Sequence, residues 1–193
     1  MSAFDIKKNV DNRAAALLEH HMSLLGVGAG FSRKDTLTYE RNGAEDGNSL
    51  LICYDEKSKF MTKTYNLMFK LRVPGADLGD SFKARIKFRG MKQIDAGFFE
   101  IKPENKTAET LLNDPKLIDE IVETAQKVDI ATIKAEYSAG TEAITITLVP
   151  YAGAFLWVKL PPVYYPLKLN QKEMNQLHTL LKKIEKHINK RLE

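Results

Sequence analysis

The sequence contains a single cysteine and no long apolar run, and each shortage excludes a class of protein. Cys53 has no partner within the chain, which excludes an intrachain disulfide and a thiolate metal cluster. No window approaches the ~20 apolar residues that a membrane-spanning helix needs. The amino-terminal segment also lacks the apolar core of a signal peptide. We therefore expect a cytoplasmic protein with no membrane contact.

Motifs that carry chemistry are also missing. The sequence contains no serine nucleophile elbow, no zinc-hydrolase helix and no recognisable cysteine–histidine arrangement. His20 and His21 are adjacent, which on a helix points them about 100° apart, away from a shared metal ion. The glycine-rich segment 26–30 closes a predicted helix, whereas a dinucleotide fingerprint follows a strand and opens one. We predict no catalytic residue, no metal and no cofactor, and the sequence does not favour an enzyme.

The overall composition is that of an ordinary folded domain. Hydrophobic residues make up 44% of the chain and charged residues 28%, and 193 residues suffice for one well-cored domain. The 29 basic and 25 acidic residues leave a net charge of +4, which implies only mild attraction to polyanions. We predict a single domain over residues 1–193.

The most informative segment is 82–89, in which apolar residues alternate with cations throughout. This period of two predicts a half-buried β-strand with a basic outer face. Segment 61–73 alternates too, and a hairpin between the two segments would put Lys70 and Arg72 on the same face. Cations directly opposite each other destabilise a sheet by a few tenths to ~1 kcal/mol, so they need neutralising. The predicted anion face consists of Lys70, Arg72, Lys83, Arg85, Lys87 and Arg89.

Two interpretations of this face remain open. Glu40, Glu100 and Glu136 could neutralise the cations within the fold, leaving a solvated surface with ion pairs of little energetic weight. Alternatively, the cations bind an anionic partner, either a phosphate-bearing ligand or a nucleic-acid backbone. Nucleic acid is the less favoured partner, because Phe82 and Phe88 point inward and leave the face without stacking aromatics.

A second candidate site is an aromatic cluster between residues 151 and 165. Most such clusters belong to a core, but phenol and indole groups also orient ligands at the mouth of an apolar pocket. The predicted ligand pocket is lined by Tyr151, Phe155, Trp157, Tyr164 and Tyr165.

Periodicity and capping signals place the helices. They are predicted at about 6–25, at 114–125 behind an Asp114 N-cap and Pro115, and from the capping box of Asn170 and Glu173 to the end. Segment 160–166 is rich in proline and is predicted to be an extended connector, since proline cannot occupy a central strand. Strands are predicted at about 31–41, 49–54, 61–73, 82–89, 96–102, 131–137, 143–149 and 155–160.

The order of these elements predicts the fold class. Short turns join most consecutive strands, and such turns cannot make parallel crossovers. We predict an α+β fold with a mainly antiparallel, curved sheet of about eight strands. An N-terminal, a middle and a C-terminal helix should pack largely on one face of that sheet.

From these features we predict a non-catalytic binding protein that holds a small amphipathic or anionic ligand between sheet and helices. The alternative is a protein–protein interaction module. It would dock a protein partner or a second copy through the basic sheet face or the apolar seam of the last helix. Non-specific nucleic-acid binding ranks third.

Overall fold

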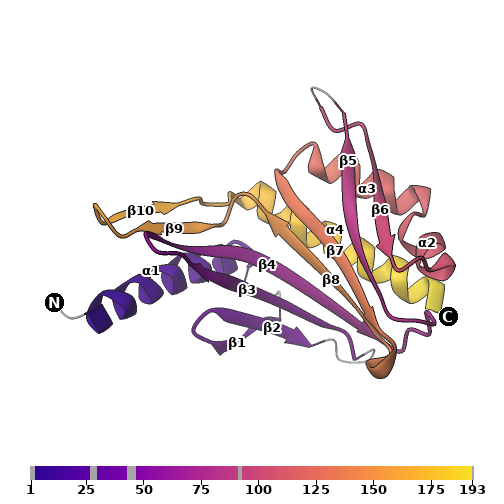
Figure 1. The fold of residues 1–193 in the computed structure, drawn as a ribbon, viewed down its shortest axis with the longest axis horizontal. Helices are drawn as coiled ribbons and strands as arrows, with labels where there is room; N and C mark the ends of the chain where they lie inside the picture. The colour runs from indigo at the N-terminus through magenta and orange to yellow at the C-terminus, as the bar shows by residue number, and fades with distance from the viewer. Residues whose placement is uncertain (1–2, 27–29, 43–46, 91–92, 193) are drawn as a thin grey trace.

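The computed structural model describes residues 3–26, 30–42, 47–90 and 93–192. Within these ranges, ten strands form one antiparallel sheet, which four α-helices accompany (Figure 1). The predicted α+β class with N-terminal, middle and C-terminal helices is confirmed. The helices are α1 (Ala3–Ser23), α2 (Lys106–Leu112), α3 (Pro115–Ala125) and α4 (Gln171–Leu192). The strands are β1 (Ser32–Asp35), β2 (Thr38–Asn42), β3 (Ser49–Ser58), β4 (Thr62–Pro74), β5 (Phe82–Arg89), β6 (Ala96–Lys102), β7 (Ile130–Ser138), β8 (Ala143–Pro150), β9 (Phe155–Val158) and β10 (Val163–Pro166).

The later helices begin at the predicted caps. The Asn170 side chain accepts a hydrogen bond from the Glu173 backbone N–H at 2.9 Å, and the Glu173 carboxylate accepts one from the Asn170 N–H at 2.8 Å. This reciprocal pair is the capping box that starts α4. Asp114 likewise accepts from the Lys116 N–H at 3.0 Å, just before Pro115 opens α3.

The sheet order is β1-β2-β3-β4-β8-β7-β5-β6, and β9 and β10 extend it beside β4. The carboxyl half of the long strand β4 pairs with β8, and its amino half pairs with β9. The predicted hairpin between segments 61–73 and 82–89 is therefore wrong, because β8 and β7 lie between β4 and β5. The connecting loop crosses these two strands at their ends: Ala76 donates its N–H to the Glu142 carbonyl and accepts from the Tyr137 hydroxyl.

Two local differences raise the strand count above the predicted eight. Segment 31–41 turns at Asp35, whose side chain accepts from the Leu37 N–H at 2.8 Å, and so forms the β1–β2 hairpin. Segment 163–166, predicted as a connector, pairs with β9 as the edge strand β10. Its prolines at 161, 162 and 166 stand at an edge, where a missing N–H breaks no ladder. The glycine-rich segment 26–30 and the predicted turn 42–48 lie partly outside the described residues.

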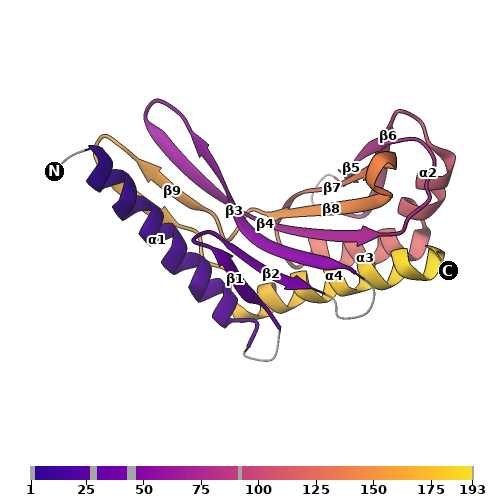
Figure 2. The ribbon, with the colours of Figure 1, turned by 90° about the horizontal axis from the view of Figure 1, so that it is seen from below.

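Helices α1, α3 and α4 lie on one side of the sheet, and the sheet bends so that its other side is concave and uncovered (Figure 2). We call this uncovered side the open face. On the helix side, Phe82, Ala84 and Ile86 are buried as predicted, and Phe88 is partly buried against the same core. In the part of the chain that the structure describes, no helix is long and apolar enough to cross a bilayer.

Candidate anion-binding site

The strand register brings the predicted anion face together on the open face, in rows that cross five strands. In one row, Arg72 of β4 lies opposite Thr145 of β8, and Thr145 lies opposite Glu136 of β7. The row continues from Glu136 to Lys83 of β5 and then to Lys102 of β6. Strands that are far apart in the sequence thus present their polar side chains side by side.

A second row runs parallel to the first, two residues further along each strand. It begins at Lys70, which lies opposite Thr147, and continues through Lys134 and Arg85 to Glu100. Lys134 and Arg85 are direct cross-strand neighbours, and like charges in that position repel each other. The positive charges of the face are therefore least neutralised along this second row.

The three predicted acidic partners neutralise only some of these cations. Glu100 accepts hydrogen bonds from Lys87 at 3.3 Å and Lys102 at 2.7 Å. Hydrogen bonds from Lys102 and Lys87 hold the pKa of Glu100 below its usual value, which keeps it ionised. Glu136 lies 3.9 Å from Lys83, whereas Glu40 pairs with Lys34.

The remaining cations of the face have no acidic partner among the described residues, and Arg89 contacts only the ring of Phe98. Among the residues with described positions, Lys70, Arg72, Arg85 and Lys134 form no ion pair and no side-chain hydrogen bond. Arg72, Arg85 and Lys134 are exposed, and Lys70 is half-buried. Neutralisation within the fold therefore accounts for only part of the face.

One end of the open face is hollowed. A concavity of about 540 Å³ lies between the ends of β4, β5, β6, β7 and β8. Arg72, Lys83 and Lys102 contribute cations to its wall. Hydroxyl groups also line it, from Ser81, Ser138, Thr141 and Thr145. Cations and hydroxyl donors around a hollow of this size are the groups that bind phosphate or carboxylate oxygens.

The sequence-based prediction missed three residues of this face. Lys102 and Lys134 each lie two positions from a glutamate already assigned to the outer face, so the same alternation identifies them. Phe98 lies opposite Lys87, and the Arg89 guanidinium stands 4.8 Å from the centre of its ring. The open face therefore carries one aromatic side chain that the inward direction of Phe82 and Phe88 did not suggest.

The five predicted pocket aromatics are distributed over different environments. Phe155 and Trp157 are buried in the core, and Tyr164 is half-buried, with its ring stacked on Phe155. Tyr151 and Tyr165 are exposed. None of the five lines the hollow or the groove between α3 and α4.

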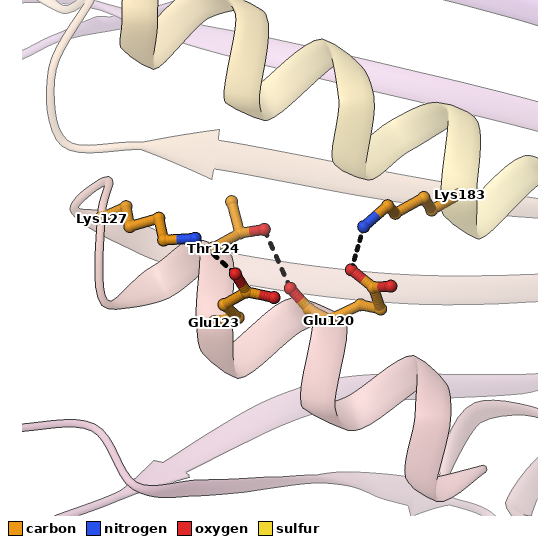
Figure 3. Close-up of polar contacts among 5 residues, drawn as sticks. All are labelled: Glu120, Glu123, Thr124, Lys127 and Lys183. Carbon is orange, nitrogen blue, oxygen red and sulfur yellow. Dashed lines mark hydrogen bonds and ion pairs between the residues drawn. The ribbon is translucent and has the colours of Figure 1, made fainter.

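That groove has a volume of about 500 Å³ and lies on the helix side of the molecule. Two of its three lysines are paired: Lys183 of α4 with Glu120, and Lys127 with Glu123, whereas Lys172 forms no ion pair with a described residue (Figure 3). The Thr124 hydroxyl donates to the Glu120 carbonyl at 2.9 Å. The groove lining has three lysines and two glutamates, whereas the hollow has three cations and one glutamate, so the hollow is the more positive of the two and suits an anion better.

Cysteine and histidine add no reactive group to the face. Burial raises the pKa of the Cys53 thiol and outweighs the opposite effect of nearby Lys70, so the thiol stays protonated. Among the described residues, no cluster of histidine, cysteine, aspartate and glutamate could hold a metal ion.

Comparison with known protein families gives a match for this chain. Residues 30–188, which are most of the chain, match a family described as "Protein of unknown function (DUF3156)". No curated protein and no solved structure matches the chain.

Proposed function

We propose that this chain, which belongs to the DUF3156 family of proteins of unknown function, is a binding protein whose open face holds an anionic ligand. The observation that carries the proposal is the set of cations without acidic partners, Arg72, Arg85, Lys70 and Lys134, on an uncovered sheet face. Charges in such fixed positions cost free energy through mutual repulsion, which a bound anion relieves.

The ligand belongs on the open face rather than between sheet and helices. The side chains between those layers form one packed cluster that runs from α1 to α4. The hollow, in contrast, is open to solvent and has the volume typical of small-ligand sites. Its three cations and its hydroxyl groups suit a small molecule with phosphate or carboxylate groups, and Glu136 can accept a hydrogen bond from the same ligand.

Pyrophosphate is a suitable probe, because it has the charge of such a ligand and no apolar part. We expect it to raise the melting temperature of the wild type, since a ligand that binds only the folded state stabilises it. In the double variant Arg72→Gln with Lys83→Gln, the dissociation constant for pyrophosphate should rise roughly tenfold for each lost charge-assisted hydrogen bond. Isothermal titration calorimetry at low salt measures both constants.

The matched control is Lys182→Gln with Lys186→Gln, which removes two exposed cations of α4, on the helix side of the molecule, that form no ion pair with a described residue. This variant should bind pyrophosphate as the wild type does. Equal binding by both double variants would show that net charge alone attracts the anion. That result, or an unaffected wild-type melting temperature, contradicts the proposal.

A further inference from the structure

Two neighbouring hairpins end in exposed apolar side chains at the same end of the molecule. The β3–β4 turn carries Phe60, which is 89% exposed, and Met61. The β9–β10 turn carries Leu160, which is 74% exposed, followed by Pro161 and Pro162. Both views of the fold show these two turns side by side (Figures 1 and 2).

A backbone hydrogen bond fixes the two turns to each other. The Lys159 N–H donates to the Met61 carbonyl at 2.9 Å, which continues the β4–β9 ladder to its last residues. Within the β3–β4 turn, Lys59 and Thr62 exchange backbone hydrogen bonds. The apolar side chains are therefore held on ordered hairpins, and burial within this chain does not explain their presence at the tips.

A lysine precedes the exposed apolar residue in each turn. The two motifs are Lys59-Phe60-Met61 and Lys159-Leu160-Pro161. Neither Lys59 nor Lys159 forms an ion pair with a described residue, whereas nearby Asp55 and Glu56 are paired with Lys57 and Lys63. Among the described residues of the two turns, the charges without an ionic partner are therefore positive.

We propose that the two hairpin tips dock on the surface of a bilayer that contains anionic lipids. Phe60, Met61 and Leu160 would enter the boundary between headgroups and acyl chains, while Lys59 and Lys159 contact anionic headgroups. This goes beyond the proposed ligand site, which lies elsewhere on the sheet. It also departs from the sequence-based expectation of no membrane contact, which was based on the lack of a spanning segment.

A bilayer fits these tips better than a protein partner does. A stable protein interface buries about 800 Å² on each side, which calls for a broad patch of some twenty residues. The tips instead present a few apolar side chains at the ends of turns, with cations directly behind them. Shallow insertion needs only this arrangement, and charge complementarity selects an anionic surface.

Vesicle binding tests the proposal directly. We expect the wild type to bind vesicles of about two-thirds phosphatidylcholine and one-third phosphatidylserine, and to bind pure phosphatidylcholine much more weakly. Phe60→Ser with Leu160→Ser should lower the partition coefficient about tenfold or more, since inserted apolar area is lost. Lys59→Gln with Lys159→Gln should lower it roughly fivefold for each lysine at low salt.

The matched control removes apolar side chains that are exposed elsewhere. Tyr151 and Leu167 are 65% and 52% exposed and lie outside both turns, so Tyr151→Ser with Leu167→Ser should bind vesicles as the wild type does. Arg72→Gln with Lys83→Gln, which impairs the proposed anion site, should still bind vesicles, and that binding should still be lost when the tip residues are replaced. The two proposals, anion binding at the hollow and membrane docking of the tips, can therefore fail independently.

Insertion has a spectroscopic signature of its own. The only tryptophan, Trp157, is buried, so brominated acyl chains should quench the wild type weakly. In Phe60→Trp the new indole should be quenched strongly on vesicle binding. Absence of binding, equal binding by the tip variants, or an unquenched Phe60→Trp would each overturn the proposal. So would a wild-type dimer that the tip variants abolish, because a second copy would then cover the tips.

Discussion

His21 is a fully buried histidine that the fold holds in its neutral form. Its Nε2 accepts a hydrogen bond from the Leu169 N–H at 3.3 Å, which joins α1 to the segment before α4. Burial, together with the charges of His20 and Lys168, lowers the pKa of His21 from 6.5 to about 4. The ring is therefore uncharged at neutral pH, and protonation opposes folding.

The free energy of unfolding should fall as the pH drops from 6.5 to 4. In this range the unfolded histidine binds a proton that the folded one does not, so acid favours the unfolded state. A pKa displaced from 6.5 to about 4 corresponds to roughly 3 kcal/mol, all of it lost below pH 4. Urea unfolding at a series of pH values should show a smaller slope in His21→Gln, in which the amide oxygen can still accept from Leu169.

His187→Gln is the control for this measurement. It removes an imidazole elsewhere in the fold, which is only partly buried and contacts the Leu111 carbonyl at 3.0 Å. An undiminished slope in His21→Gln would assign the acid sensitivity to other groups. His178 is the next candidate, since burial and the charges of Lys182 and Arg41 also lower its pKa to about 4.

For Lys63, the sequence predicts the direction of the side chain but does not predict its partners. Its position in strand β4 places it on the buried side, where a lone cation has to find a partner. The partners are Asp11 of α1 at 2.6 Å and Glu56 of β3 at 3.0 Å. Alternation indicates that Lys63 points inward, but no local pattern identifies a carboxylate on a helix far away in the sequence.

At the scale of elements, α4 contributes a complete face to the core. Its buried residues recur with helical spacing, so the apolar seam packs on the chain's own sheet. Deletion of residues 173–193 should therefore abolish cooperative unfolding, and Leu181→Ala should lower the free energy of unfolding by about 2 to 5 kcal/mol. Circular dichroism with urea titration measures both effects.

Exposed Lys186 on the same helix provides the control. Lys186→Gln should change the free energy of unfolding by less than about 0.5 kcal/mol. A truncated chain that stays folded and merely changes its oligomeric state would show that α4 serves association instead of packing.

Local signals predicted the elements well, whereas pairing partners could not be predicted. The caps at Asp114 and Asn170 and the alternation in β4 and β5 depend on neighbours within a few residues. Which strands pair depends on contacts between distant segments, and the loop after Pro74 passes two strand ends before β5 begins. The cations still share one face, because antiparallel neighbours preserve alternation across any number of intervening strands.

At the scale of the whole molecule, one hydrophobic cluster joins all the layers. It runs from Val10 in α1 to Ile188 in α4 and includes residues from both ends of the sheet. We expect a single cooperative unfolding transition, since no part of the described chain has a core of its own. Trp157 fluorescence and far-ultraviolet circular dichroism should give the same urea midpoint. Two separate midpoints would show that the β9–β10 end unfolds independently.

The anion face was predictable to the extent that it follows alternation. Its six predicted cations were assigned from strand parity, and Lys102 and Lys134 follow by the same argument. The hollow was not predictable, because it forms where the ends of strands from both halves of the chain meet. The docking tips were also missed, since an exposed Phe60 or Leu160 in a turn has no periodic pattern around it.

The proline-rich margin of strand β10 has a consequence for behaviour at high concentration. Fibril growth proceeds when another chain adds a strand to a free edge through its backbone amides. Pro161 and Pro162, just before this four-residue strand, and Pro166, its last residue, offer no amide hydrogen. The β9–β10 hairpin can thus expose apolar side chains at its turn while its edge strand resists the strand addition that starts fibril growth.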